Sequence, residues 1–169
     1  VRHVVYDAIS DSKALDAFEI AYGERALPTY NFSNADVIVS IGADFLGDWQ
    51  GGGHDSGYVE GRVPIKNGNQ KAKMSKHFQF ESNMSISGAN ADKRISLTPT
   101  QQKIALAKIY GYISGNEVAE KLPEKFELSI KKAANSLIKA GNKGIIINGI
   151  DDVNAHLVAY KINDLLESI

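Results

Sequence analysis

Residues 36–42 form the segment that most restricts what this chain can fold into. The run Val37–Ile41 is rich in β-branched residues, and its apolar residues are continuous rather than alternating. Strands with this pattern are buried on both faces, as parallel strands are when helices cover both sides of their sheet. Gly42 follows directly, where a tight turn must leave such a strand. The segment therefore predicts a parallel sheet between two helix layers.

Strand-like and helix-like segments alternate along the rest of the chain. Further short strands are expected at residues 3–6, 76–81, 95–97 and 145–147. Between them, apolar residues recur at helical spacing, and Thr98-Pro99-Thr100-Gln101 has the pattern of a helix start with a capping box. Asp151 or Asp152 is expected to cap the last helix. This alternation predicts an α/β fold: an open, mainly parallel, Rossmann-like sheet with helices on both faces.

The chain is expected to be one domain, residues 1–169, with one unusual region. Seven of the 15 glycines lie between Gly47 and Gly68, where no periodic apolar pattern is present. Because glycine raises the entropy that is lost on ordering, residues 47–75 are predicted to form a flexible loop or insertion. The sequence starts at Val1 without a start methionine, so the domain is expected to be a fragment of a longer subunit.

Composition removes several classes of function. The chain has 19 Lys and Arg against 20 Asp and Glu, a net charge of -1, which gives no electrostatic reason to expect nucleic acid as a partner. No apolar run is long enough to cross a bilayer, so no direct membrane insertion is expected. There is no cysteine, which excludes disulfides, thiolate metal sites and iron–sulfur ligation within these residues.

In such folds ligands bind outside the carboxyl ends of the strands, and three segments of this chain are expected there: 42–47, 87–94 and 148–152. None matches the Gly-x-Gly-x-x-Gly fingerprint or a phosphate loop. A turn glycine after a strand is needed for structure alone, which favours a structural role for these segments. Asp44 either holds a ribose or purine or caps a turn. The candidate cofactor-binding residues are Gly42, Ala43, Asp44, Gly88, Asn90, Asp92 and Arg94.

No catalytic residue and no metal site are predicted. The four histidines are not at a helical ligand spacing, and no serine stands in a nucleophile motif. Trp49 precedes the glycine run, where it either covers the core or faces a partner.

Two long segments, 35–49 and 78–94, resemble a known family. They are similar to the molybdopterin-oxidoreductase-like half of the iron–sulfur subunit of alternative complex III, a bacterial quinol–cytochrome c oxidoreductase whose relatives are labelled iron–sulfur-cluster-containing hydrogenase components. The resemblance implies a molybdopterin-oxidoreductase type of domain. It also implies a place on the periplasmic face of the cytoplasmic membrane, within an electron-transfer complex whose iron–sulfur clusters lie elsewhere in the parent subunit.

Departures from that family's pattern bear on function. Glu81-Ser82-Asn83 stands where active members of the wider family have an Asp-Pro-Arg-like turn, and residues 99–102 lack the glycine and the acid that contact the guanine of the cofactor. The resemblance therefore implies a non-catalytic, cofactor-free scaffold domain that contacts other domains and subunits, in which the candidate residues are vestigial. The alternatives are part of a molybdenum bis-guanine-dinucleotide site and a nucleotide-binding module.

Overall fold

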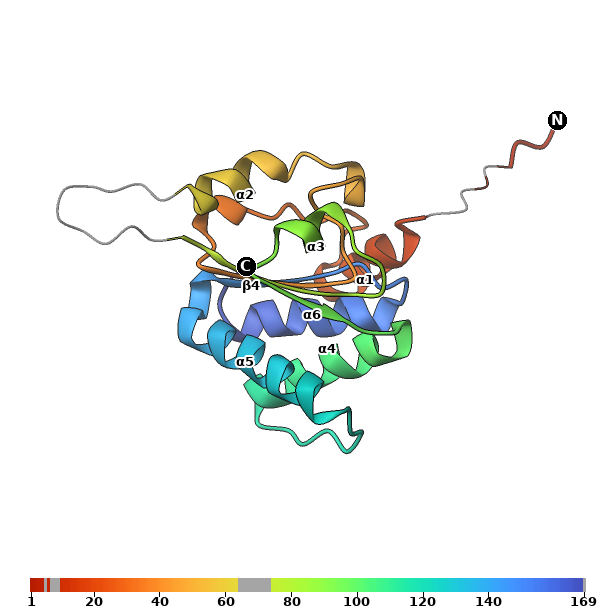
Figure 1. Ribbon diagram of the computed structural model, residues 1–169. Coiled ribbons are helices and arrows are strands. Elements are labelled where there is room, and N and C mark those ends of the chain that lie inside the picture. The colour runs from red at the N-terminus through yellow and green to blue at the C-terminus, as the bar shows by residue number, and fades with distance from the viewer. Residues whose placement is uncertain (5, 7–9, 64–73, 169) are drawn as a thin grey trace.

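The computed structural model describes residues 1–4, 6, 10–63 and 74–168. Helices and strands alternate along it (Figure 1). Their order is α1 (Ser12–Tyr22), η1 (Phe32–Asn34), β1 (Val37–Ile41), η2 (Trp49–Gly51), α2 (Asp55–Arg62), β2 (Lys76–Glu81), α3 (Ile86–Asn90), β3 (Lys93–Ser96), α4 (Pro99–Ser114), α5 (Glu124–Ala140), η3 (Gly141–Lys143), β4 (Gly144–Asn148) and α6 (Val153–Leu165).

The four strands form one parallel sheet in the order β3-β2-β1-β4. Val39 on β1 pairs with Phe78 of β2 on one side and with Ile146 of β4 on the other. The chain therefore proceeds outward from β1 to β3 and then crosses to the far side of β1, which places the topological switch point between β1 and β4. The predicted open, parallel α/β sheet is confirmed.

Helices cover both faces of the sheet, which explains the continuous apolar strands. Helices α4, α5 and α6 lie on one face, and α2 and α3 lie on the other (Figure 1). Val39 and Ile41 belong to the core under α4–α6, whereas Ile38 points into the second core with Phe32 and Phe45. Successive side chains of β1 thus enter opposite cores, and all five of its residues are buried.

Local sequence signals fix several helix ends. Thr98 and Gln101 form the predicted capping box at the start of α4, with Pro99 in its first turn. Of the two candidate caps for the last helix, Asp152 is the one used: its side chain accepts from the backbone N–H groups of Asn154 and Ala155.

The outer edge of β4 is closed by a side chain rather than by another strand. Asn163 of α6 accepts from the N–H of Ile146 and donates to its carbonyl, both at 2.9 Å. Unpaired strand edges invite pairing with other chains, and this amide occupies both outward backbone groups at that position.

The predicted strand at residues 3–6 is wrong for the residues that are described. Val4 and Tyr6 are 75% and 88% exposed and lie in no helix or strand, while Val5 is outside the described residues. A short apolar run forms a strand only beside a partner, and the two places beside β1 are taken by β2 and β4.

The region predicted as a flexible loop, 47–75, contains η2 and α2. In α2 the buried Tyr58 enters the second core. A Cβ at Gly61 would lie 3.3 Å from Ser75 Oγ and 3.4 Å from the Phe32 carbonyl oxygen, so this glycine allows α2 to pack closely on its neighbours. Glycine density here reflects close packing as well as turns. Residues 64–73 lie outside the described residues, and the predicted flexibility stays a prediction.

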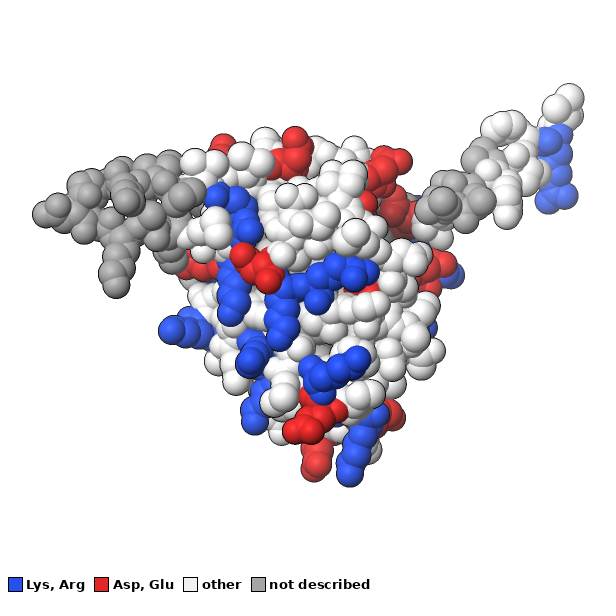
Figure 2. All heavy atoms as spheres, viewed as in Figure 1, with Lys and Arg blue, Asp and Glu red and all other residues white. Residues whose placement is uncertain are grey.

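Within the described residues, no helix is long and apolar enough to cross a membrane. On the face drawn in Figure 2, Lys and Arg side chains are interspersed with Asp and Glu side chains. This face carries no continuous surface of one sign.

Candidate functional site

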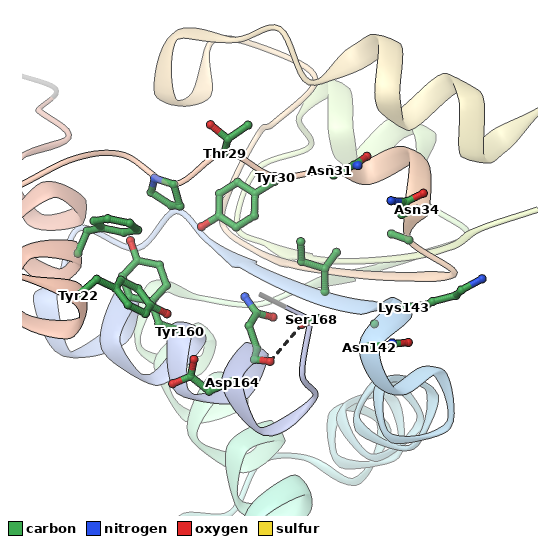
Figure 3. Close-up of a pocket in the computed structure, with 16 residues that line it drawn as sticks. Tyr22, Thr29, Tyr30, Asn31, Asn34, Asn142, Lys143, Tyr160, Asp164 and Ser168 are labelled. Carbon is green, nitrogen blue, oxygen red and sulfur yellow. Dashed lines mark hydrogen bonds between the residues drawn. The ribbon is translucent and has the colours of Figure 1, made fainter. Parts of the chain in front are cut away.

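A pocket of about 550 Å³ lies at the amino end of β4, opposite to the end where parallel α/β folds bind ligands (Figure 3). The rings of Phe18, Tyr22 and Tyr160 pack together on one side, with centroids 4.7–6.0 Å apart. Tyr30 lies across from them with its hydroxyl directed toward the pocket (Figure 3). We name this hollow the amino-end pocket.

The phenols of the amino-end pocket are neutral. Burial, followed by the neighbouring Tyr22, raises the pKa of Tyr160 to about 12, and burial likewise raises the pKa of Tyr30. Burial and then the charge of Asp164 raise the pKa of Tyr22. Neutral phenols and amides offer packing and hydrogen bonds, but they supply neither a nucleophile nor a general base at neutral pH.

The opposite end of the sheet brings together the loops that follow β1, β2 and β4. Gly42 leaves β1 with φ +70° and donates its N–H to the carbonyl of Phe80. A Cβ at Gly149 would lie 2.5 Å from the Gly42 carbonyl oxygen and 2.7 Å from Ala43 Cα. The loops after β1 and β4 are therefore in backbone contact at the switch point, where related folds open a crevice.

Asp44 ties the loop after β1 to the start of α3. Its Oδ1 accepts from the N–H of Ser87 at 2.8 Å, and the Ser87 hydroxyl accepts from the N–H of Leu46 at 2.9 Å. This reciprocal pair explains Asp44 as a structural carboxylate that satisfies a free N–H at a helix start.

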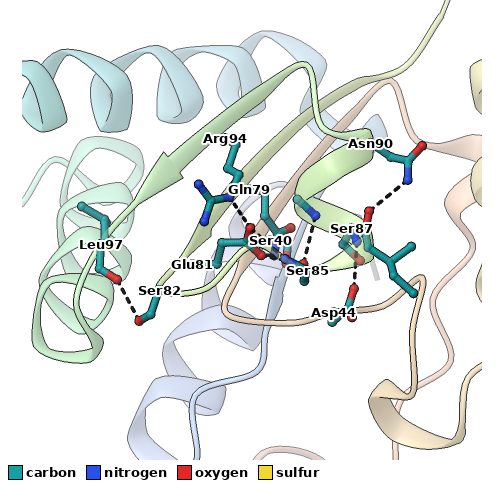
Figure 4. A network of polar contacts seen from close by, with 12 residues as sticks. Ser40, Asp44, Gln79, Glu81, Ser82, Ser85, Ser87, Asn90, Arg94 and Leu97 are labelled. Atoms are coloured by element: carbon teal, nitrogen blue, oxygen red, sulfur yellow. Dashed lines mark hydrogen bonds and ion pairs between the residues drawn. The ribbon is translucent and has the colours of Figure 1, made fainter.

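Glu81, at the end of β2, is the centre of a buried polar network (Figure 4). It is 4% exposed, and its carboxylate accepts from Arg94 Nε and Ser85 Oγ, both at 2.5 Å, and from Gln79 Nε2 at 3.2 Å. A Cβ at Gly88 would overlap this carboxylate. Gly88 and Arg94 therefore accommodate and neutralise a buried charge, as a buried carboxylate requires.

Asn90 and Asp92 face α2. Arg62 pairs with Asp92 at 2.6 Å, and the N–H of His77 donates to the same carboxylate oxygen at 2.7 Å. Burial opposes the charge on Asp92, but these two hydrogen bonds and the Arg62 charge hold its pKa below its ordinary value. The hydroxyl of Tyr58 donates to the Asn90 carbonyl at 3.0 Å.

A polar row on β2 connects these groups beneath α2 and α3. His77 and Gln79 are fully buried, with His77 Nε2 lying 3.1 Å from Gln79 Oε1 and its Nδ1 lying 3.2 Å from the Tyr58 hydroxyl. Burial lowers the pKa of His77 to about 4 despite the Gln79 hydrogen bond. Gln79 in turn donates to the Ala43 carbonyl at 3.0 Å.

The structure thus places Gly42, Ala43, Asp44 and Gly88 at the carboxyl end of the sheet, with Arg94 reaching Glu81 there. Asp92 instead precedes β3 and contacts the start of β2, and Asn90 faces α2, so the expectation that these two residues lie at the carboxyl end is wrong. Sequence reasoning missed the centre of the network, which is Glu81 with Gln79 and His77. The alternation within Lys76–Glu81 was the available signal, because its polar positions share one face of β2. Within the described residues, no group of three or more His, Cys, Asp or Glu could hold a metal ion.

A second hollow, of about 520 Å³, lies outside the backbone contact at the switch point. Residues 48–51 after β1, residues 149–151 after β4, the start of α1 and His156 of α6 line it. We name it the switch-point cleft. Asp11, Asp48 and Asp151 outnumber Lys13 among its lining residues, so the cleft is acidic and repels phosphate groups. Trp49 lines it while packing against the second core.

No family model matches the chain, and no curated protein matches it. Its fold is similar to that of a chain in the crystal structure of the formyltransferase/hydrolase complex FhcABCD from Methylorubrum extorquens, solved with methylofuran. The TM-score is 0.57 at 15% sequence identity, over 92% of this chain and 40% of that chain. The likeness concerns the fold, and this chain spans less than half of the chain it matches.

These comparisons correct the family resemblance stated above. The solved structure described above, which is similar to this chain, belongs to a formyltransferase/hydrolase complex, not to a quinol–cytochrome c oxidoreductase. No match to a family model or to a curated protein supports alternative complex III or a molybdopterin oxidoreductase. In the structure, segment 35–49 holds β1 with its turn, and segment 78–94 holds most of β2 together with α3.

Proposed function

We propose that this chain is a non-catalytic scaffold domain of a multisubunit protein assembly. The observation that carries the proposal is made at the carboxyl end of the sheet. There the polar groups that a nucleotide would need are already bonded to other groups of the chain. Asp44 accepts from Ser87, Arg94 pairs with Glu81, and the Ala43 carbonyl accepts from Ser40 and Gln79.

Two further observations support this reading. The switch-point cleft, a hollow at this end of the sheet, is acidic and disfavours phosphates. The similar solved chain is part of a complex, the formyltransferase/hydrolase complex, which favours partner subunits for this chain too. A role in electron transfer, a periplasmic location and the expected lack of a cofactor stay predictions.

The rival function is a nucleotide-binding module, and calorimetric titration with GDP separates the two. A scaffold gives no saturable heat at millimolar GDP. Micromolar binding that is lost in Asp44→Ala would overturn the proposal. Asp44→Asn is the matched control, because its amide oxygen still accepts from Ser87 and keeps the loop in place.

The assembly role has its own test. A tagged parent protein, purified from its native cells, should carry partner proteins at constant stoichiometry. Deleting residues 1–169 should release at least one of those partners while the rest of the protein stays folded. Retention of all partners by the deleted form would overturn the scaffold role.

A further inference from the structure

Carboxylates outnumber the one lysine, Lys13, among the residues that line the switch-point cleft. Asp11, Asp48 and Asp151 make no side-chain hydrogen bond or ion pair with any described residue. Asp152 is not part of this set, because it caps α6 and pairs with Lys103. The cleft therefore presents three carboxylates that form no hydrogen bond or ion pair among the described residues, although the charge of Asp151 acts on His156, and carboxylates only accept hydrogen bonds.

A buried histidine adds a second, independent feature. His156 is 6% exposed and lines the cleft, and its ring packs against Tyr160 with centroids 6.3 Å apart. It forms no hydrogen bond within the part of the chain that the structure describes. The ring nitrogens of His156 are not among the fully buried atoms that lack a partner, so they remain accessible to a group bound in the cleft.

Gln50 is the third feature. Its Oε1 is buried without a partner, and its backbone has φ +49°, a conformation that residues other than glycine rarely adopt. Strain of this kind concentrates at binding sites. Its neighbour Trp49 adds an aromatic ring to the same wall of the cleft.

The chemistry of these groups selects the ligand. Three carboxylates and a neutral imidazole can all accept hydrogen bonds, and an indole ring favours a flat cation on its face. The N-terminal ends of α1 and α6 would by themselves favour an anion. At these ends, however, the Ser12 N–H donates to the Ser10 hydroxyl, and Asp152 accepts from the first N–H groups of α6, so these donors are already used.

We propose that the switch-point cleft binds a guanidinium group. A guanidinium offers five planar donors to the acceptors of the cleft and one flat face to Trp49. A bound metal ion does not fit, because no group of three potential ligands is close enough among the described residues. The guanidinium belongs to a free small molecule or to an arginine side chain of a partner, and the proposal does not depend on the scaffold role.

Trp49 makes the test direct, because it is the only tryptophan in the chain and its fluorescence reports on the cleft. Arginine amide should change this fluorescence saturably. Citrulline amide has the same shape without the charge, and its affinity should be lower by about tenfold or by a larger factor. Equal binding of the two amides, or tighter binding of GDP or Mg²⁺, would overturn the proposal.

Variants localise the site. Asp48→Asn and Asp151→Asn should each weaken arginine amide by roughly threefold or more. Asp164 is an exposed carboxylate in the amino-end pocket, and Asp164→Asn should leave the affinity for arginine amide unchanged. An equal loss in all three variants would mean that net charge, not the cleft, attracts the cation, and would overturn the assignment.

A peptide with a central arginine distinguishes the two sources. If it binds more tightly than arginine amide, the cleft receives a protein side chain. If it binds more weakly, the cleft takes a free guanidinium compound. Absence of binding by both overturns the proposal.

Discussion

Gly88 lies directly against the carboxylate of Glu81, so close that a Cβ at position 88 would overlap Glu81 Oε1. The first turn of α3 therefore passes over a buried charge with no room for a side chain. This contact joins the end of β2 to α3 and shapes the whole carboxyl end of the sheet.

We expect Gly88→Ala to destabilise the domain by roughly 2–4 kcal/mol, because the added methyl group displaces a buried carboxylate from Arg94 and Ser85. Denaturant unfolding followed by circular dichroism measures the change. Gly57→Ala is the matched control: its Cβ would make ordinary contacts in α2, and alanine favours the helix. Equal effects of the two variants would contradict this account of Gly88.

Asn163→Ala removes both hydrogen bonds to Ile146 and leaves a buried N–H and carbonyl without partners. We expect a loss of about 2–4 kcal/mol in unfolding free energy, from the cost of unsatisfied buried groups. Asn154→Ala, at an exposed position of the same helix, should change stability by a few tenths of a kcal/mol at most. A stable Asn163→Ala protein would show that the edge of β4 does not need this amide.

Ile146→Asp should prevent folding. The side chain is fully buried beneath the helices, and an unpaired charge there costs several kcal/mol, comparable to the stability of a whole domain. Ile138→Asp, on the half-exposed face of α5, should fold with near-normal stability. Cooperative unfolding of Ile146→Asp at normal denaturant concentrations would contradict the placement of β4.

Stability should fall as the pH is lowered below neutrality, and His77 is a specific cause. Its pKa is about 4 in the folded chain against an ordinary 6.5, so between these values only the unfolded chain binds the proton. This contribution is fully present above pH 6.5 and is lost progressively toward pH 4, by roughly 3 kcal/mol in total.

His54 and His156 also have lowered pKa values, so they too make stability fall as the pH is lowered. Because both are present in the wild type and in His77→Gln, the difference between the two proteins isolates the contribution of His77. The variant should lose less stability than the wild type between pH 7 and pH 4. His3→Gln, at the exposed amino terminus, should follow the wild type. Parallel curves for wild type and His77→Gln would rule out a neutral, buried His77.

Sequence patterns predicted the fold well where local physics decides it. Val37–Ile41 indicated a doubly covered strand, and Thr98 with Gln101 indicated a helix start; both are as expected. The segment at 3–6 has the same local pattern, but strand formation depends on a free partner, which no local pattern encodes. Glycine density in α2 predicts flexibility, whereas Gly61 serves a close contact with Ser75 that only the fold reveals.

The candidate site was predicted by place but not by role. Gly42, Asp44 and Arg94 lie at or near the carboxyl end of the sheet, as the strand pattern indicated. Their partners could not be read from the chain, because Asp44 bonds to Ser87 and Arg94 to Glu81 only once β2 and α3 are placed beside β1. The sequence places Glu81 at the end of an alternating strand, and its burial follows only once α3 and Arg94 lie beside it.

The strand order has a consequence for how the protein is made. Val37 pairs with Gly144, which is 107 residues further along the chain, so β1 lacks one of its two neighbours until residues 144–148 have been synthesised. Non-local pairings of this kind form late and slowly. During synthesis, the bare edge of β1 is the part of the nascent chain most open to wrong partners, and β4 is the segment whose emergence ends that exposure.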